Sequence, residues 1–225
     1  MNIQNRPVVW SATHKLWLAM VLAAQLTAAY VIGSGHWLAN DAHSLLPPIG
    51  ITAVVPVVIF VLAYNVLPAF RSFVLALDIR LLTAVQLWRV VGLAFLLLYA
   101  LEILPASFAW PAGIGDVAVG ISAIYVLSRM NNDPAYVTGN GYAAFHAMGL
   151  LDFAVAIGTA GLAAGGFPGL TSNGPTTAAM DVWPLNIFPS FIVPVFIILQ
   201  LTALLKARQM RRAIAGKAQS ASQPA

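Results

Sequence analysis

The chain has 225 residues, of which 60% are hydrophobic and 8% are charged, and its formal net charge is +4. A soluble domain carries about a quarter charged residues, so this composition excludes a water-soluble globular protein. The absence of cysteine excludes disulfides, thiolate chemistry and cysteine metal sites. The basic residues are dispersed along the chain, so the positive charge does not indicate nucleic-acid binding.

Continuous apolar runs of about 20 residues, the length of a helix that crosses a bilayer, recur along the whole chain. We therefore predict an all-α polytopic membrane helix bundle of six transmembrane helices, at about 16–32, 49–67, 83–104, 108–127, 142–164 and 185–205. A barrel is disfavoured because its strands would alternate polar and apolar residues. We expect a single domain over 1–212 and a disordered cytoplasmic tail, rich in Ala, Ser and Gln, over 213–225.

Two segments of this layout have alternative interpretations. The first run follows a basic lead, which is also typical of a signal peptide cleaved near Gly33, but its length and Trp17 at its edge favour a retained span. Residues 70–82 are apolar but interrupted by Arg71, Asp78 and Arg80. They form either an interfacial helix or the beginning of the third span.

The lysines and arginines predict the orientation, because they collect on the cytoplasmic side of spans. With six spans and a cytoplasmic N-terminus, the outer loops hold none of them. The inner segments hold Arg6, Lys15, Arg71, Arg80, Arg129, Lys206, Arg208, Arg211, Arg212 and Lys217. This partition predicts that both termini are cytoplasmic.

Two acids lie in the middle of apolar runs. Residues 113–121 and 149–157 share the pattern Gly-x-x-Asp-x-Ala-Val-small-Ile, with Asp116 and Asp152 at its centre. Counted from the inner ends of their spans, these acids lie about 18 Å and about 15 Å deep. An ionisable group at that depth is costly and indicates a functional site.

Small residues flank both acids at i−3 and i+4, which lets helix backbones approach closely: Gly113 and Gly120, and Gly149 and Ala156. Since the two spans run antiparallel, we expect both carboxylates at one seam.

Arg89 begins about 9 Å above the inner end of the third span, with Gln86 on the same face. One arginine shared by two acids leaves one net negative charge, which favours a proton held between the acids. The predicted proton, cation or solute site is therefore Asp116, Asp152, Arg89 and Gln86. Two alternatives are open: Arg89 extends to the inner headgroups, or the acids are protonated and only hold helices together.

The histidines are weaker candidates. His146, six residues before Asp152, points away from it and is expected to be a packed residue rather than a ligand. His36, Asp41 and His43 in the first outer loop could form a weak metal site, but a solvated loop is favoured. We expect no metal and no cofactor.

The runs 86–92, 108–116 and 149–152, with Phe188-Pro189-Ser190-Phe191-Ile192-Val193-Pro194, resemble a group of uncharacterised bacterial multi-pass membrane proteins. The resemblance covers about two-thirds of the chain. It implies a bacterial inner (cytoplasmic) membrane location and no particular activity.

Gly113-Ile114-Gly115-Asp116 is similar to the GxGD motif of intramembrane aspartyl proteases. The resemblance implies that Asp116 and Asp152 would be the catalytic pair. The chain departs from the family pattern, because the second aspartate follows the motif and no Pro-Ala-Leu occurs in the later spans. Val119 also replaces the lysine that prepilin peptidases carry.

The sequence thus favours a small proton- or cation-linked transporter or a solute-binding membrane protein. An intramembrane aspartyl hydrolase is the enzyme alternative, and a structural or accessory subunit is the third. We expect the partners to be the lipid bilayer and a small solute or ion, not nucleic acid. A homo-oligomer is left open.

Overall fold

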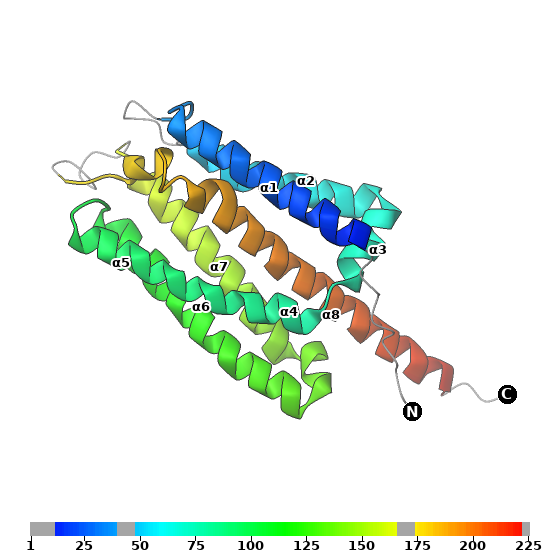
Figure 1. The fold of residues 1–225 in the computed structure, drawn as a ribbon. Helices are drawn as coiled ribbons and strands as arrows, with labels where there is room; N and C mark the ends of the chain where they lie inside the picture. The colour runs from blue at the N-terminus through cyan, green and yellow to red at the C-terminus, as the bar shows by residue number, and fades with distance from the viewer. Residues whose placement is uncertain (1–11, 40–47, 166–173, 222–225) are drawn as a thin grey trace. The chain divides into compact units, whose positions relative to one another are not determined.

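The computed structural model describes residues 12–39, 48–165 and 174–221, and all regular structure in these ranges is helical (Figure 1). Six helices within them are long and apolar enough to cross a membrane: Lys15–Ser34, Ile49–Val66, Ile79–Ala100, Ala106–Asn132, Asn140–Leu162 and Phe188–Gly216. The all-α class is confirmed, and the six helices are compatible with an integral multi-pass membrane protein. The orientation of the termini stays a prediction.

Several helix ends differ from the expected ones. The third span begins four residues early, because Oδ1 of Asp78 accepts hydrogen bonds from the backbone N–H of Arg80 (2.7 Å) and of Leu81 (3.3 Å) and so caps its first turn. At the C-terminus the helix continues to Ala221, where we expected a disordered tail from residue 213. Alanine, lysine, arginine and glutamine are strong helix formers, which accounts for the extension.

Residues 70–82 divide between the two alternatives. Helix α3 (Pro68–Ala76) is a separate short helix with proline in its first turn, where the missing N–H costs nothing. Leu77 interrupts the helical backbone, and the residues from Ile79 onward belong to the third span. Asp41 and His43 of the first outer loop lie outside the described residues.

The described chain divides into two compact units, and the single domain expected over 1–212 stays a prediction. The first unit comprises residues 1–77 and 161–195, with helices α1 (Ala12–Ser34), α2 (Ile49–Val66) and α3, the 3₁₀ turn η3 (Thr177–Asp181) and the π-helical turn η4 (Phe188–Ile192). Turn η4 packs against α1 and α2. There the hydroxyl oxygens of Ser190 and Thr52 are 2.9 Å apart, and Gln25 donates to the Ser190 carbonyl at 3.2 Å. Pro189 lies in this turn, so the sixth span begins with irregular winding.

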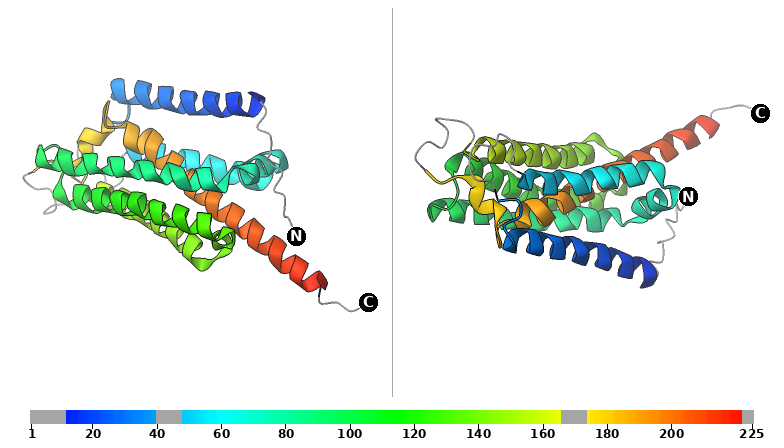
Figure 2. Two further views of the ribbon diagram at one scale, coloured as in Figure 1. Left: turned by 60° about the horizontal axis from the view of Figure 1, so that its bottom comes forward. Right: turned by 90° about the horizontal axis from the view of Figure 1, so that it is seen from above.

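The second unit comprises residues 78–160 and 196–225. Its third span is one continuous rod built from α4 (Ile79–Ala84), the 3₁₀ segment η1 (Val85–Gly92) and α5 (Leu93–Ala100). A short connection returns the chain into α6 (Ala106–Asn132), which runs back along this rod (Figures 1 and 2). Helix α7 (Asn140–Leu162) and most of α8 (Val193–Ala221) complete the unit.

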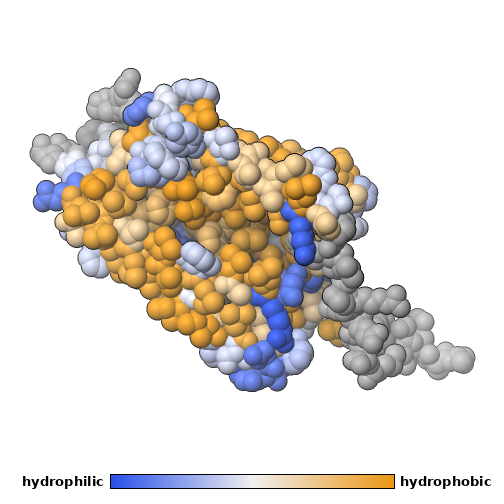
Figure 3. Space-filling view, viewed as in Figure 1, coloured by the Kyte–Doolittle hydropathy of each residue, from blue (hydrophilic) through white to orange (hydrophobic). Residues whose placement is uncertain are grey.

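Large apolar side chains cover the outside of the spans. In the second unit Leu97, Ile121 and Ile124 are 61%, 58% and 61% exposed. Figure 3 shows hydrophobic residues over most of the face it draws. The polar side chains that are buried in this unit are Thr83, Gln86, Arg89, His146, Gln200 and Thr202. Polar side chains turned inward beneath an apolar exterior are the arrangement that a bilayer favours.

Candidate functional site

The site begins with the winding of the third span. Segment η1 is a 3₁₀ helix with three residues per turn, so residues three apart lie on one line. The buried residues of the segment are Gln86, Arg89 and Gly92, in that register, whereas Trp88 is 70% exposed. The 3₁₀ winding therefore aligns the amide of Gln86, the guanidinium of Arg89 and the backbone of Gly92 on the buried face of the third span.

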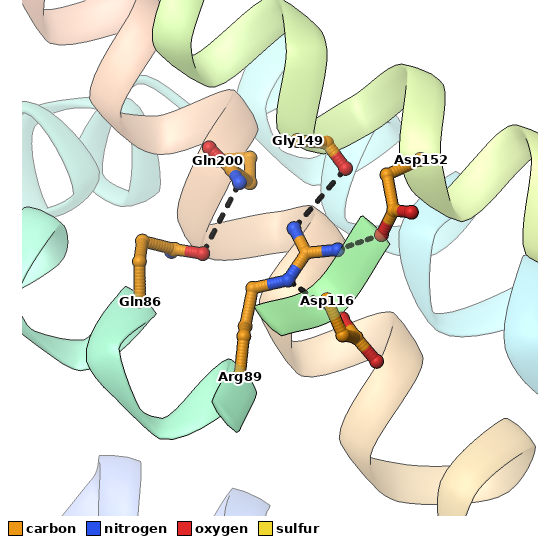
Figure 4. A network of polar contacts seen from close by, with 6 residues as sticks. All are labelled: Gln86, Arg89, Asp116, Gly149, Asp152 and Gln200. Carbon is orange, nitrogen blue, oxygen red and sulfur yellow. Dashed lines mark hydrogen bonds and ion pairs between the residues drawn. The ribbon is translucent and has the colours of Figure 1, made fainter. Parts of the chain in front are cut away.

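The guanidinium of Arg89 has a different partner in each of three directions (Figure 4). Nε donates to Oδ1 of Asp116 at 2.8 Å, and Nη1 donates to the carbonyl oxygen of Gly149 at 3.2 Å. Nη2 donates to Oδ2 of Asp152. The plane of the group also lies over the Phe153 ring, with Cζ 3.9 Å from the ring centroid, which is within the range of a cation–π contact.

Glycines make room for both acids. A methyl group at Gly92 would overlap the side chain of Asp116, and a methyl group at Gly115 would overlap the carboxylate of Asp152. On α6, Gly113 and Gly120 lie against the backbone of the third span rather than against α7. The small-residue face predicted around Asp116 thus brings its helix close to Arg89. At Gly115 the same helix meets Asp152 directly, and Arg89 bonds to both acids at this seam.

The cluster is enclosed. The side chain of Arg89 is 1% exposed, and those of Asp116 and Asp152 are 16% and 11% exposed. Arg89 therefore does not extend toward the end of its span, which was one of the two open interpretations. The structure brings Arg89, Asp116 and Asp152 together as the depth and face of each residue predicted.

The fourth predicted site residue lies beside this ion-pair cluster. Gln86 is fully buried, and its Oε1 accepts a hydrogen bond from Nε2 of Gln200 at 3.1 Å. Its own Nε2 donates to the Leu82 carbonyl at 3.4 Å. Gln86 thus belongs to a second hydrogen-bonded chain. This chain reaches the cluster at Gly149, where Gln200 and Arg89 both approach the position that a β-carbon would occupy.

Gln200 and Phe153 were not identified from the sequence. Gln200 is the one amide within the apolar run Val193–Leu205 and is completely buried, so its isolation was the available signal. Phe153 carried no such signal, because an aromatic residue in a membrane helix is ordinary. Its role depends on the ring facing the guanidinium.

His146 is packed, as expected, but it also has a polar partner. Its ring meets Tyr142 and Phe145 edge to face, with centroids 4.6 Å and 4.9 Å away, and its Nδ1 is hydrogen-bonded to Oε1 of Gln200. His36, the described member of the weak metal candidate, lies in the turn after α1.

The charges set what this arrangement can do. With both acids ionised, one guanidinium faces two carboxylates, which leaves one uncompensated negative charge in a low-dielectric interior. Such a charge is stabilised by taking up a proton or a cation. Among the described residues, Oδ2 of Asp116 and Oδ1 of Asp152 have no hydrogen-bond donor, so both remain available.

The chain was compared with protein families, curated proteins and solved structures. Neither the curated proteins nor the solved structures gave a match. The family described as "Domain of unknown function (DUF8737)" matches residues 46–208, a range that includes the whole ion-pair cluster, Gln86 and Gln200. Because this match spans well over half of the chain, the protein belongs to the DUF8737 family.

Proposed function

We propose that this protein is a small proton-linked transporter or solute-binding protein of the bacterial inner membrane. In this proposal Arg89, Asp116 and Asp152 bind the coupling ion, and Gln86 supports the site from the neighbouring hydrogen-bonded chain. Both termini are cytoplasmic. The observation that carries the proposal is one buried guanidinium bonded to two carboxylates within helices long enough to span a membrane.

A proton suits the site better than a metal cation. The two carboxylate oxygens without a donor, one on each acid, are enough to hold one proton. Hard cations take six or more oxygen ligands, and the guanidinium of Arg89 already fills the space between the acids. Binding one proton brings the cluster to neutrality, and releasing it restores the buried charge.

An intramembrane aspartyl hydrolase would use the same two acids. Its carboxylates would have to share a water molecule as a general acid and base. Here Arg89 is bonded to both carboxylates, which supports charge storage better than water activation. A structural or accessory subunit is the remaining alternative, and it predicts no ion movement at all.

Proton flux into liposomes tests the proposal. The full-length protein is reconstituted with a pH-sensitive dye inside, a pH gradient is imposed, and the potassium permeability is set with an ionophore. We expect flux above that of empty liposomes, and at least a tenfold loss in Asp116→Asn and Asp152→Asn. Asp133→Asn is the matched control, because Asp133 is exposed and asparagine keeps its hydrogen bond to the Ala135 N–H.

Stability measured on the same samples excludes a trivial explanation. Both cluster variants should keep the melting temperature of the unmodified protein to within a few degrees, because asparagine retains the shape and hydrogen bonding of aspartate. No flux from the unmodified protein, together with a marked loss of melting temperature in Asp152→Asn, would reduce the cluster to a packing device.

A further inference from the structure

Besides the acids, the second unit contains a buried titratable group that the proposed site does not use. His146 on α7 is 0% exposed, and within the described part of the chain its Nε2 has no hydrogen-bond partner. A buried polar atom without a partner is rare and destabilises the folded state. Helix α7 also carries Asp152, six residues or about 9 Å further along.

The hydrogen-bonded chain that ends at this histidine has a fixed direction. The Leu82 carbonyl can only accept, so the Gln86 atom that bonds to it is the NH₂ group, and Oε1 of Gln86 must then accept. Gln200 therefore donates its own NH₂ to Gln86 and presents its oxygen to the ring. Because an amide oxygen cannot donate, Nδ1 of His146 carries the hydrogen in this bond.

This direction assigns the tautomer of the neutral ring. With the hydrogen on Nδ1, the lone pair of neutral His146 is on Nε2, the atom without a partner. A proton that binds there forms an imidazolium and leaves every existing hydrogen bond of the chain intact. The ring is thus set to accept a proton at one defined atom.

The charged groups around the ring decide whether such binding is favourable. Of the elements around the ring, α7 contributes Tyr142 and Asp152, and the third span contributes Arg89, which is paired with Asp116 of α6. Gln200 and Arg89 both approach the position that a β-carbon on Gly149 would occupy, about one turn from His146, so the hydrogen-bonded chain of the ring meets the cluster there. The other charged group on α8 near this interior is Lys206, which interacts with Asp78 before α4. Whether His146 is neutral or protonated should therefore depend on the net charge of the ion-pair cluster.

We infer that Nε2 of His146 is a second proton-binding position, alternative to the acid pair and coupled to it through Gln200 and Gly149. A proton on the acids gives a neutral cluster and a neutral ring. When that proton leaves, a carboxylate is restored, and a proton bound at Nε2 then compensates its charge as an imidazolium. The summed charge of Arg89, the two acids and His146 is zero in both states. The two states differ in whether the proton is on the acid pair or on the ring.

This inference rests on the proposed function for the role of the proton as the coupling ion, but proton binding is measurable without flux. The probe is nitrogen NMR of the full-length protein, labelled with ¹⁵N-histidine and held in lipid nanodiscs. The chain has four histidines, so a variant in which His14, His36 and His43 are replaced by glutamine leaves His146 as the only signal. We expect the Nδ1–H tautomer at high pH and protonation of Nε2 as the pH falls.

Coupling is tested with the acid. The comparison is made above the pH at which the acid pair loses its proton, because only there is the cluster of the unmodified protein anionic. In Asp152→Asn the cluster is neutral at every pH, so the population of the His146 imidazolium at that high pH should be at least tenfold smaller. Two controls should leave that population unchanged: Asp133→Asn, which removes an exposed charge, and Tyr142→Phe, which keeps the edge-to-face ring contact.

An Nε2–H tautomer at high pH would overturn the inference, as would a ring that stays neutral until the protein unfolds. An imidazolium population that is the same in Asp152→Asn, above the pH at which the acid pair loses its proton, would also overturn it. The two proposals fail separately. A coupled, protonating His146 in a protein without flux removes transport and leaves the second proton position. Flux through a protein whose His146 never protonates removes the second position alone.

Discussion

Asp116 and Gly92 face each other where α6 packs against the third span, and the aspartate side chain fills the space that a β-carbon on the glycine would occupy. Arg89 lies one 3₁₀ turn before Gly92, so its Nε meets the same aspartate at 2.8 Å. The ion pair and the helix contact are therefore one structure. A change in backbone packing at this point moves the charges, and a change in the charges alters the packing.

Removal of Arg89 should destabilise the protein in a pH-dependent way. In Arg89→Gln both carboxylates lose their counter-ion, and breaking a buried pair costs about 3–5 kcal/mol. At low pH the acids escape most of this cost by taking up protons, so the loss of melting temperature should be larger at pH 8 than at pH 5. Arg89→Lys should be intermediate, because an ammonium keeps the charge but not the three-way geometry.

Thermal melting in detergent at both pH values measures this effect. The matched control is Arg212→Gln, since Arg212 is exposed on α8, and it should melt like the unmodified protein. An equal loss for Arg89→Gln at the two pH values would show that the carboxylates do not bear the uncompensated charge.

Gly115 should tolerate no side chain. In Gly115→Ala the new methyl group would overlap the Asp152 carboxylate and push it away from Arg89, and overpacking of this kind costs about 1–3 kcal/mol. Gly158 on α7 is the control, because a β-carbon there meets nothing within 4 Å. Gly158→Ala should leave the melting temperature unchanged or raise it, since alanine is the better helix former. If the two variants melted alike, close packing at Asp152 would be excluded.

The sequence was sufficient for the parts of the structure that depend on composition and depth. Continuous apolar runs predicted six spans, because a bilayer requires backbone hydrogen bonds to be satisfied within each helix. The depth of Arg89, Asp116 and Asp152 predicted that they could meet, because long apolar helices leave few other places for charged groups.

The remaining features depend on local geometry that periodicity does not encode. A 3₁₀ segment inside an apolar helix has the same kinds of residues as the α-helix around it. The alignment of Gln86, Arg89 and Gly92 on one face was therefore visible only in the structure. Gln200 is distant in sequence from every residue it contacts, and nothing local indicated its partner. The separate helix α3 depends on a break at Leu77, a residue that would be ordinary within a helix.

In the first unit, the π-helical turn η4 should depend on its contact with α2. The hydroxyl of Thr52 donates to the Ile49 carbonyl at 2.6 Å, so the Ser190 hydroxyl is the donor in the 2.9 Å contact between them. Thr52→Val removes the acceptor and should cost about 1 kcal/mol, whereas Thr52→Ser keeps it and should cost less. Ser190→Ala in the Thr52→Val background should add little, because the pair is already broken. Melting temperatures of the single and double variants measure this coupling, and simple additivity would contradict the contact.

The predicted orientation is open to a direct test. Reporter fusions at Asp41, Ala106 and Asn173 should report the extracytoplasmic side, because the outer loops contain no lysine or arginine. Fusions at Ser72, Asn132 and Ala215 should report the cytoplasm. A cytoplasmic signal at Asn173 would reverse the last hairpin, and with it the assignment of both termini to one side.

The acid pair should hold one proton at neutral pH, and infrared spectroscopy can detect it. The argument is a count of charges: two carboxylates and one guanidinium leave one excess negative charge, and a buried interior favours neutrality. The unmodified protein should therefore show a protonated-carboxyl band that shifts in heavy water. Asp116→Asn and Asp152→Asn should each abolish this band, because the remaining acid is then balanced by Arg89 and needs no proton. Arg89→Gln should strengthen it, since both acids must then be protonated to lose their charge. Asp133→Asn should leave it unchanged, because that acid is exposed to solvent. A band that survives both cluster substitutions would come from another carboxyl, and the charge count at Arg89 would then have to be balanced by a cation instead.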